Sequence, residues 1–350
     1  MINILVDWKN KNNFFLQEEL NKNGFRSVVF DIPDFEIRDR TIKHRIIILY
    51  LKYLKLAYRA LINSSEDDIV VCWNFNTAIA FGYLCRLTGK KRKIVALNII
   101  AHKKNVILET IRRCICSPIM KMKHCYITVN SKQYVEDYAR RFRVSIKKFF
   151  VLHDPVQTHR KIPYQFRDSY VFCGGEAQRD WASLFAAAEQ LPQIKFVCIA
   201  RKKYFDPLLT PPANVELHFD TDYETFFRYL RNASIVAIPL KSKLASGLII
   251  LLEAALMSKP IIVTRTPSTS NYIINDDQGI LIDRKNPAQL RDAINRLYPD
   301  RQLQKKLADN LLTFLMEHHS HSKYTSRLIE IIETINAQNP TPSLDLSGNT

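Results

Sequence analysis

Long apolar runs are absent from this sequence. It contains no stretch of 18 or more apolar residues, so no transmembrane helix is expected. The opening stretch, MINILVDWKNKNN, is a strand-like run followed by polar residues, which is not the pattern of a secretory signal peptide. Glycine is also scarce, with 8 among 350 residues. The hydrophobic share of 47% is still enough for complete cores, and the length suits two domains.

Cysteine usage does not indicate a disulfide framework. The chain has seven cysteines, an odd number, and several lie in apolar runs, as Cys72, Cys173 and Cys198 do. This usage predicts reduced thiols and a cytoplasmic protein. One group has a spacing that fits none of the usual zinc-ligand patterns, and no metal is expected there: Cys114, Cys116, His124 and Cys125.

Acidic residues are few in the first half of the chain. Residues 1–160 contain 29 Lys+Arg against 14 Asp+Glu, a balance of +15. Residues 161–350 contain 22 against 20, a balance of +2. Solubility does not require such an uneven distribution. It favours an anionic surface that faces the first half of the protein.

Strand-like and helix-like segments alternate along the chain. Short β-branched or apolar runs predict strands at 2–7, 27–32, 68–73, 93–101, 125–130, 149–154, 170–175, 194–200, 215–219, 234–240, 261–264 and 279–283. Helices are expected at 13–23, 41–62, 76–88, 106–123, 131–142, 180–190, 222–232, 247–257, 287–297, 301–317 and 321–337. This alternation predicts an α/β fold of two doubly wound, Rossmann-like domains facing across a cleft.

The link between the two domains is expected near Pro155–Pro163. We therefore predict a first domain at 1–157 and a second at 158–320. The helix at 321–337 is expected to pack back on the first domain, and residues 338–350 to form a disordered tail. In doubly wound sheets ligands bind beyond the carboxyl ends of the strands, so site residues are expected there.

A single carboxylate, Glu253, lies in the apolar stretch SGLIILLEAALMSKPIIVTRTPS, residues 246–268. The stretch predicts a helix over 247–257 that stops before Pro260, followed at once by a buried strand, IIVT. An unpaired charge inside such a helix would be costly, so a partner for this carboxylate is expected.

Three segments resemble the GT-B nucleotide-sugar glycosyltransferases, most closely glycosyltransferase family 4 (group 1 type). SGLIILLEAALMSKPIIVTRTPSTSNYI resembles the donor-site block of that family, with its LLEAM, GKPVI and Thr/Gly-rich turn. VFCGGEAQRDWASLFAAAEQLPQIKFVCIA resembles the first strand, loop and helix of the donor domain, and GILIDRKNPAQLRDAINRLYPDRQLQKKLADN matches its C-terminal stretch. The resemblance is good over about 165–320, moderate over 93–157 and general over 1–92. It implies a hexosyltransferase-type enzyme.

The resemblance implies a donor site in the second domain. Glu253 matches the last acid of the family's Glu-x7-Glu motif, which contacts the nucleotide ribose, whereas the first acid falls on Ala245. Arg179 matches the Lys that pairs with the diphosphate. Further donor-binding candidates are Gly174 and Gly175, which would let the diphosphate approach the backbone. Ser246, Gly247 and Leu248 would offer backbone N–H groups at a helix start. Arg201 would add a cation, and Phe219 falls at the family's nucleobase pocket.

Some of these residues have a plainer interpretation. Glu253 can cap local backbone, and Phe219 can be a core aromatic. Arg201, like Lys202 and Lys203 beside it, can be an ordinary solvated charge.

In the first domain, His102 ends the segment KIVALNIIAH, where several relatives carry a His or Asp facing the transferred sugar. A histidine there is suited to handle a proton, although it can equally cap the following loop. Asp7 and the loop KNKNN replace the usual Gly-rich first loop of the family, which marks a divergent member. Asn10 and Asn13 are candidates for contacting sugar hydroxyls.

The segment 41–62 predicts a basic amphipathic helix with aromatic residues, as found at anionic membrane surfaces. Its apolar stripe is expected to be Ile42, Ile46, Leu49, Tyr53, Leu56 and Ala60, with Ile48, Leu51 and Tyr58 between them. Its cations, with two from the helix at 106–123, are expected to face the membrane: Arg45, Lys52, Lys55, Arg59, Arg112 and Arg113. A solvated outer face is the alternative for this helix.

These observations predict a cytoplasmic, bacterial-type enzyme attached peripherally to the inner face of the cell membrane. It would transfer a sugar from a UDP- or GDP-sugar to a lipid-linked or surface-glycan acceptor (capsule, O-antigen, exopolysaccharide or lipopolysaccharide core). The family resemblance implies retention of configuration and no cofactor or metal.

Three alternatives differ in class. The first is a GT-B sugar-nucleotide 2-epimerase, for which the loop at 241–248 is poor in the required carboxylates and His. The second is a non-catalytic relative that serves an assembly complex, which Ala245 keeps open. The third is a nucleic-acid-binding protein, but no recognisable binding module is present and no nucleic-acid partner is expected.

Overall fold

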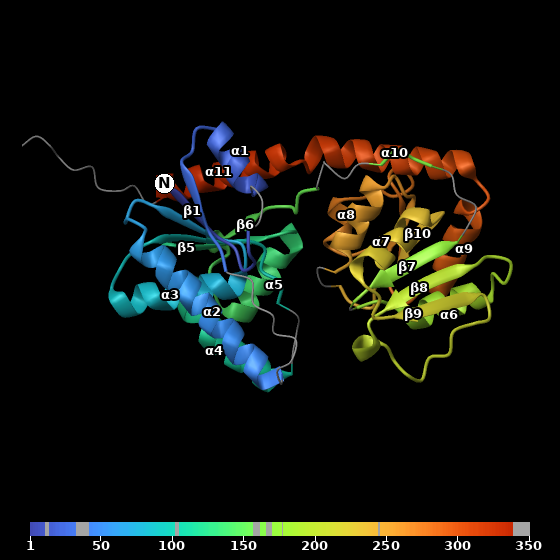
Figure 1. Cartoon of the computed structure of the whole chain (residues 1–350), viewed down its shortest axis with the longest axis horizontal. Helices are drawn as coiled ribbons and strands as arrows, with labels where there is room; N and C mark the ends of the chain where they lie inside the picture. Colours follow the sequence, from blue (N-terminus) through green and yellow to red (C-terminus); the bar gives the residue numbers. More distant parts are fainter. Residues whose placement is uncertain are drawn as a thin grey trace, which may run out of the picture. The chain divides into compact units, whose positions relative to one another are not determined.

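The computed structural model of the chain describes residues 1–10, 14–32, 42–101, 105–156, 162–165, 170–176, 178–243 and 246–338, with residues 42–46 described in their backbone only. The chain forms two compact units (Figure 1). Unit 1 comprises Met1–His153 together with His321–Thr350, and unit 2 comprises Asp154–Ser320.

Unit 1 is built on a six-stranded parallel sheet in the order β2-β1-β3-β4-β5-β6. The strands are β1 (Ile2–Leu5), β2 (Ser27–Phe30), β3 (Ile69–Cys72), β4 (Lys93–Ala96), β5 (Cys125–Val129) and β6 (Phe149–Val151). β1, β3, β4 and β5 are buried along their whole length. Their mostly apolar sequences follow from helices that cover both faces of a parallel sheet.

The helices described in this unit are α1 (Phe15–Lys22), α2 (Ile42–Ile62), α3 (Phe75–Thr88), α4 (Val106–Met120), α5 (Lys132–Phe142) and α11 (His321–Gln338). α1 and α11 pack together on one face, while α2, α3 and α4 cover the other (Figure 1). Sequence sets the starts of two of these helices. The side chains of Asn74 and Asn105 accept hydrogen bonds from backbone amides in the first turns of α3 and α4.

Unit 2 is built on a second six-stranded parallel sheet in the order β12-β11-β10-β7-β8-β9. Its strands are β7 (Val171–Gly175), β8 (Phe196–Ala200), β9 (Val215–Phe219), β10 (Ile235–Ile238), β11 (Ile261–Thr264) and β12 (Ile280–Ile282). Helices α7 (Tyr223–Asn232), α8 (Leu248–Leu256) and α10 (Arg301–His318) contribute to the core on one face, and α6 (Trp181–Glu189) and α9 (Pro287–Leu297) to the core on the other.

The structure confirms the predicted fold class, an α/β fold with two doubly wound parallel sheets. The unit borders at 153/154 and 320/321 lie close to the expected domain borders, and α11 packs against α1 within unit 1. One expected strand, 93–101, is shorter, because β4 ends at Ala96. Beyond it Asn98 adopts a positive φ of 37°, and its amide donates to Thr128 Oγ1 at 2.7 Å.

Candidate functional site

The strand order of unit 2 defines a switch point between β7 and β10. Chain connections leave β7 toward β8 and β9 on one side, and β10 toward β11 and β12 on the other. Because every pairing is parallel, the carboxyl ends of β7 and β10 lie at the same edge of the sheet. A crevice outside the strand ends at such a point is the usual ligand site of doubly wound folds. Most of the expected donor-binding residues belong to the segments that leave these strands.

The segment after β7 places Arg179 against the two glycines. The Arg179 side chain is 4% exposed, and its Nε donates a hydrogen bond to the carbonyl oxygen of Gly174 at 2.8 Å. Gly175 has a φ of +142°, and a Cβ built on it would lie 2.7 Å from Arg179 Cζ. Glycine is therefore required at 175 both by backbone conformation and by the approach of the guanidinium.

Backbone hydrogen bonds fasten the Arg179 segment to the end of β10. The amide of Asp180 donates to the carbonyl oxygen of Pro239 at 3.0 Å, and the amide of Lys241 donates to that of Gln178 at 3.0 Å. Arg179 and Leu240 form an isolated antiparallel bridge. The loop that carries the cation and the loop that leads into α8 therefore lie side by side.

The start of α8 follows that second loop. Gly247 precedes the helix with a φ of 81°, and the first turn has no side-chain cap. The carbonyl oxygen of Gly247 accepts from the amide of Leu251 at 3.0 Å. Because the first amides of a helix have no partner within it, this turn can bind an anion, provided that other groups assist. Ser246 is partly exposed and Leu248 is buried.

Glu253 lies further along α8 and is 8% exposed, among leucines and alanines. The sequence predicted such a buried carboxylate. It belongs to the helix that follows β10, one of the two strands at the switch point.

Arg179 contributes a buried positive charge to this site. Burial lowers the pKa of Arg179 from its ordinary value. Among the residues that the structure describes, no carboxylate forms an ion pair with it. A buried cation without an anionic partner is costly unless a ligand supplies the charge. The side chain is therefore suited to an anion such as a diphosphate.

Arg201 and Phe219 lie at the neighbouring strand ends. Registers pair Gly175 with Ala200 and Ala200 with Phe219, so Arg201 follows directly beside Glu176. Arg201 Nε lies 3.1 Å from Glu176 Oε1, and its Nη1 lies 3.9 Å from Asp220. Phe219 is exposed, and its ring packs edge-on against that of Phe205. Arg201 thus has acidic partners that the sequence alone did not reveal.

Hydroxyl groups at the end of β11 and just after it hold the neighbouring loops in place. The sequence analysis did not predict this role. Thr264 Oγ1 accepts from the amide of Leu240 at 2.8 Å, which holds the loop after β10. Thr269 Oγ1 donates to the carbonyl oxygen of Thr264 at 2.8 Å and accepts from the amide of Thr266 at 2.9 Å. The segment TRTPST could have indicated these contacts, because Ser and Thr hydroxyls often hydrogen-bond to the backbone in tight turns.

In unit 1, Asp7 follows β1, and its carboxylate accepts a hydrogen bond from Asn74 Nδ2 at 2.8 Å. The backbone amide of Asn10 donates to Asp31 Oδ2 at 3.0 Å. Three positions with expected roles lie outside the described residues: Asn13, His102 and Ala245.

An aromatic cluster that includes Trp8, the residue after Asp7, was not predicted from the sequence. The ring of Trp73 lies 5.9 Å from that of Trp8 and 5.1 Å from that of Phe14. Trp8 is exposed, Trp73 is partly exposed and Phe14 is buried. The cluster therefore presents an aromatic surface at Trp8, the residue that follows Asp7.

The expected membrane-facing cations lie on α2 and α4. On α2, Lys55 and Arg59 are exposed and Lys52 is partly exposed, whereas the side chain of Arg45 lies outside the described residues. Arg112 Nη1 on α4 lies 2.9 Å from Glu109 Oε1, and Arg113 is partly exposed.

Throughout the described ranges, no helix is both long enough and apolar enough to cross a membrane. Within the same part of the chain, no three His, Cys, Asp or Glu side chains are grouped to hold a metal ion.

Comparison with known sequences finds a family match in unit 2. Residues 200–313 match the model described as "Glycosyl transferases group 1". An uncharacterized glycosyltransferase of Methanocaldococcus jannaschii is 26% identical over 98 residues, which cover 28% of this chain and 27% of the relative. The aligned part therefore spans about a quarter of that relative.

Comparison with solved structures covers nearly the whole chain. HepE of Anabaena in complex with UDP has a TM-score of 0.65 at 13% identity and covers 95% of this chain and 99% of its own. Sucrose-phosphate synthase of Thermosynechococcus elongatus has a TM-score of 0.69 at 14% identity, covering 96% and 99%. A glycosyltransferase of Rickettsia africae has a TM-score of 0.67 at 13% identity, covering 97% and 99%. These likenesses establish the fold.

Proposed function

We propose that this chain, which has the GT-B fold and matches the group 1 glycosyltransferases over residues 200–313, is a glycosyltransferase that uses a nucleotide-sugar donor. The predicted resemblance to GT-B glycosyltransferases is confirmed by the fold and by this match. The observation that carries the proposal is the arrangement at the switch point of unit 2. There the buried Arg179 contacts Gly174, and its loop is hydrogen-bonded to the loop that leads into α8, the helix that carries the buried Glu253.

In the proposed complex, the diphosphate of the donor lies at the first turn of α8 and beside Arg179. Gly174 and Gly175 let it approach the backbone of β7, and the amides of Ser246, Gly247 and Leu248 face it. The carboxylate of Glu253 accepts hydrogen bonds from the ribose hydroxyls. These groups stabilise the charge that develops on the leaving diphosphate, which supports catalysis without a metal ion.

The donor base is proposed to be uracil. HepE was solved with UDP and with UDP-glucose, and a trehalose-6-phosphate protein of E. coli was solved with UDP-2-fluoro glucose. GDP remains the second candidate. Phe219 offers a ring for the base, and Arg201 offers a second cation once it leaves Glu176.

Unit 1 is proposed to bind the acceptor, a lipid-linked or surface glycan. Asp7 and Asn10 lie after β1, where sugar hydroxyls can reach them. His102 is proposed to handle the proton of the acceptor, with retention of configuration at the transferred sugar. The excess of 15 positive charges in residues 1–160 supports an anionic acceptor at the cytoplasmic face of an anionic membrane.

Two assays test the proposal in sequence. A thermal-shift screen with UDP, GDP, ADP and CMP identifies the base, because a ligand that binds only the folded state raises the Tm. A panel of nucleotide sugars bearing that base then tests hydrolysis and transfer to lipid-linked acceptors. We expect stabilisation by UDP and release of UDP from a UDP-sugar. Conversion of the nucleotide sugar into its 2-epimer without nucleotide release would instead identify the epimerase. Absence of binding to all four nucleotides would contradict the proposal.

A further inference from the structure

Helix α2 carries an apolar stripe on its outer side. Among its described side chains, one row is buried in unit 1: Tyr53, Leu56, Ala57, Ala60 and Leu61. A second row, at spacings of four, three, four and four residues, is between 42% and 59% exposed: Ile47, Leu51, Leu54, Tyr58 and Ile62. Spacings of three and four place this row on one side of the helix, over a length of about 22 Å. We call it the α2 stripe.

The α2 stripe has a cationic edge and no acidic residue beside it on the helix. Lys52, Lys55 and Arg59 each come directly after a member of the stripe in the sequence. They therefore flank the stripe on one side of the helix. The 21 residues of α2 include no Asp or Glu. Asp31, after β2, lines the same hollow as these three cations, and its carbonyl oxygen accepts a hydrogen bond from Arg59 Nη1 at 3.1 Å. An apolar row flanked on its own helix by cations alone has the composition of a helix that lies in a membrane interface.

Helix α4 repeats this pattern. Four apolar residues in its first three turns are between 47% and 71% exposed: Ile107, Leu108, Ile111 and Ile115, which we call the α4 stripe. Arg112 and Arg113 are the cations of this helix. Exposure of these aliphatic side chains to water is unfavourable in free energy. Contiguous apolar surfaces of this kind usually mark an interaction site.

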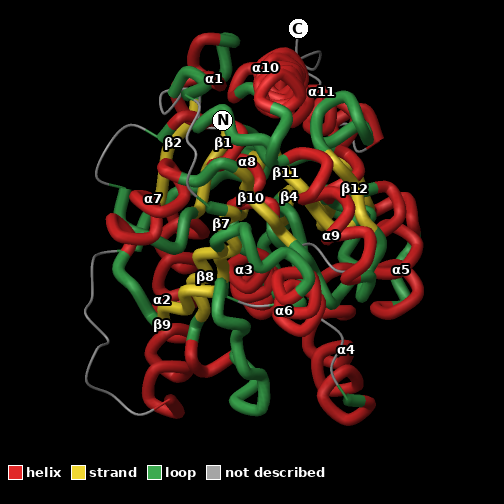
Figure 2. The backbone as a smooth tube through the Cα atoms, turned by 90° about the vertical axis from the view of Figure 1, so that its right-hand side faces the viewer, coloured by secondary structure: helices red, strands yellow, loops and turns green. Residues whose placement is uncertain are grey.

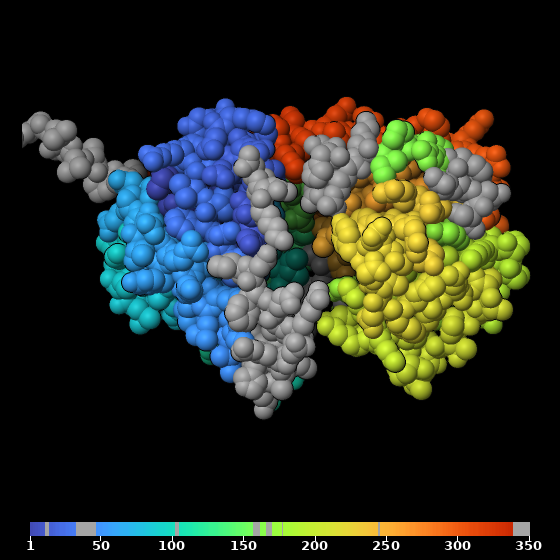
Figure 3. Space-filling model, in the orientation of Figure 1, coloured from blue at the N-terminus to red at the C-terminus, as the bar shows by residue number. Residues whose placement is uncertain are grey.

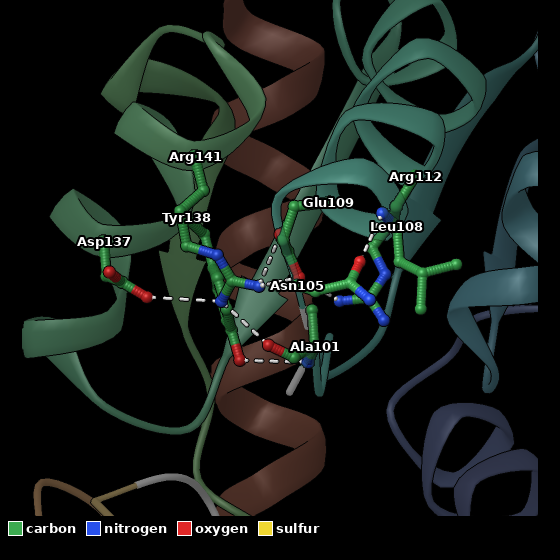
Figure 4. Close-up of polar contacts among 8 residues, drawn as sticks. All are labelled: Ala101, Asn105, Leu108, Glu109, Arg112, Asp137, Tyr138 and Arg141. Carbon is green, nitrogen blue, oxygen red and sulfur yellow. Dashed lines mark hydrogen bonds and ion pairs between the residues drawn. The ribbon is translucent and has the colours of Figure 1, made fainter. Parts of the chain in front are cut away.

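The one acidic residue of α4 is turned away from this stripe, toward α5 (Figure 4). Glu109 Oε2 lies 3.1 Å from Arg141 Nη2, and Glu109 Oε1 lies 2.9 Å from Arg112 Nη1. Arg141 also donates to the carbonyl oxygen of Ala101 at 2.8 Å, which fixes the side of α4 that faces α5. The outer sides of α2 and α4 therefore present apolar and cationic groups, and the single carboxylate is neutralised.

The two stripes belong to the same layer of unit 1. α3 packs against both α2 and α4, and all three helices cover one face of the sheet. Figure 1 shows α2 in front of α4 along the lower edge of the unit, and Figure 2, turned by 90°, shows them on either side of α3. In Figure 3 the side chains of α2, in light blue, form part of the molecular surface.

We propose that the α2 stripe and the α4 stripe insert into the acyl boundary of an anionic bilayer, while the flanking cations bind lipid headgroups. This deepens the membrane attachment in the proposed function by naming the side chains that enter the lipid. Attachment then has an apolar component that persists at high salt, in addition to an electrostatic one that salt removes.

The combination of apolar and cationic groups favours an anionic bilayer over a second copy of the chain and over a nucleic acid. A second copy of the chain in a symmetric dimer would bring the same cationic face against itself, and like charges in contact are unfavourable. A nucleic acid would pair with the cations but would leave the aliphatic stripes in water. An anionic bilayer satisfies both the apolar and the cationic groups.

The test is flotation of the full-length protein with phosphatidylcholine vesicles that contain or lack phosphatidylglycerol, at 0.1 M and 1 M salt. One variant removes members of the α2 stripe, Leu54→Ser with Tyr58→Ser, and another removes members of the α4 stripe, Ile107→Ser with Ile111→Ser. Leu208→Ser is the matched control, because Leu208 is 89% exposed in unit 2. A charge variant combines Lys55→Gln with Arg59→Gln. Equal Tm values confirm that each variant is folded.

We expect the wild type and the Leu208 variant to bind phosphatidylglycerol vesicles and to keep measurable binding at 1 M salt. Each stripe variant should bind at least about tenfold more weakly at 1 M salt, whereas the charge variant should lose binding mainly at low salt. A single-site variant, Tyr58→Trp, should show quenching by brominated acyl chains.

Three results would overturn the proposal. In the first, both stripe variants bind vesicles at 1 M salt as strongly as the wild type does. In the second, the wild type is a dimer and the stripe variants are monomers. In the third, the wild type binds RNA or DNA in preference to vesicles. None of these results depends on sugar transfer. A protein that floats with vesicles but binds no nucleotide would refute the glycosyltransferase proposal and leave this one standing.

Discussion

The guanidinium of Arg179 lies against the backbone of Gly174, to whose carbonyl oxygen its Nε donates at 2.8 Å. This contact keeps a buried positive charge at the switch point of the unit 2 sheet. It also explains why Gly175 follows, since any side chain there would meet the guanidinium. Three residues that are close in sequence thus hold a guanidinium at the end of β7.

Replacement of Arg179 should affect both stability and donor binding. Arg179→Ala leaves the Gly174 carbonyl oxygen without its donor, so we expect a loss of about 1–3 kcal/mol in the free energy of unfolding. UDP affinity should fall at least about tenfold, because a charge-assisted contact is removed. Urea unfolding and calorimetric titration with UDP measure the two effects.

Arg179→Lys separates the two roles of this residue. Lysine keeps the charge but cannot reproduce the donor geometry of the guanidinium. This variant should recover part of the UDP affinity lost in Arg179→Ala. Unchanged UDP affinity in Arg179→Ala would exclude the residue from the donor site.

Gly175→Ala tests the approach of the guanidinium to β7. A Cβ at this position would lie 2.7 Å from Arg179 Cζ, and the φ of +142° is unfavourable for alanine. Gly89→Ala is the matched control, because Gly89 has a φ of +68° and nothing within 4 Å of its Cβ position. We expect the control to cost about 1 kcal/mol of unfolding free energy and Gly175→Ala clearly more.

A double-mutant cycle then isolates the clash. If the guanidinium is what excludes a side chain at 175, Gly175→Ala should cost less in the Arg179→Ala background than in the wild type. Equal costs in the two backgrounds would show that backbone conformation alone requires the glycine.

Glu253→Gln should impair the reaction while the fold persists. Glutamine has nearly the same size as glutamate but accepts weaker hydrogen bonds from hydroxyl groups, and bonds to a charged group are worth about 1.5–3 kcal/mol. We expect kcat/KM to fall about tenfold to a hundredfold, with a higher KM for the nucleotide sugar. Glu189→Gln, at an exposed position at the end of α6, is the control. Wild-type kinetics in Glu253→Gln would remove the carboxylate from the site.

Acidic pH should weaken unit 1. Burial, with a smaller contribution from the Arg327 cation, lowers the pKa of His153. Burial and nearby lysines also lower the pKa of His124. A histidine that binds its proton less tightly when folded contributes stability above its unfolded pKa of about 6.5, and this contribution is lost as pH falls below that value.

The unfolding free energy should therefore decrease between pH 7.5 and pH 5, and His153→Asn should make this slope shallower. His318→Asn, which changes an exposed histidine, is the comparison. Urea unfolding at several pH values measures the slopes. A slope that is unchanged in His153→Asn would contradict this assignment.

The alternation of apolar runs predicted the fold because parallel strands covered on both faces are apolar throughout, as IVVC and IIVT are. The position of Glu253 was also predictable, since a lone carboxylate stands out in a helix of leucines and alanines. The acid partners of Arg201 were not, because they come from the ends of β7 and β9, and the register of those strands is not written in the local sequence.

The outer stripe of α2 was missed for a different reason. The sequence prediction placed Leu49 in one apolar stripe with Tyr53, Leu56 and Ala60, and left Leu51 and Tyr58 outside that stripe. In the structure Leu49 is exposed, as are Leu51 and Tyr58, whereas Tyr53, Leu56 and Ala60 are buried. When a helix is apolar on two sides, periodicity gives the helix but does not tell which side faces the core.

The most direct test of the central claim is a crystal structure of the protein with UDP bound. The account predicts the ribose hydroxyls within hydrogen-bonding distance of the Glu253 carboxylate. It also predicts the diphosphate at the first turn of α8, beside Arg179 and Gly175. UDP bound elsewhere, with the Glu253 carboxylate bonded only to its own chain, would contradict the claim.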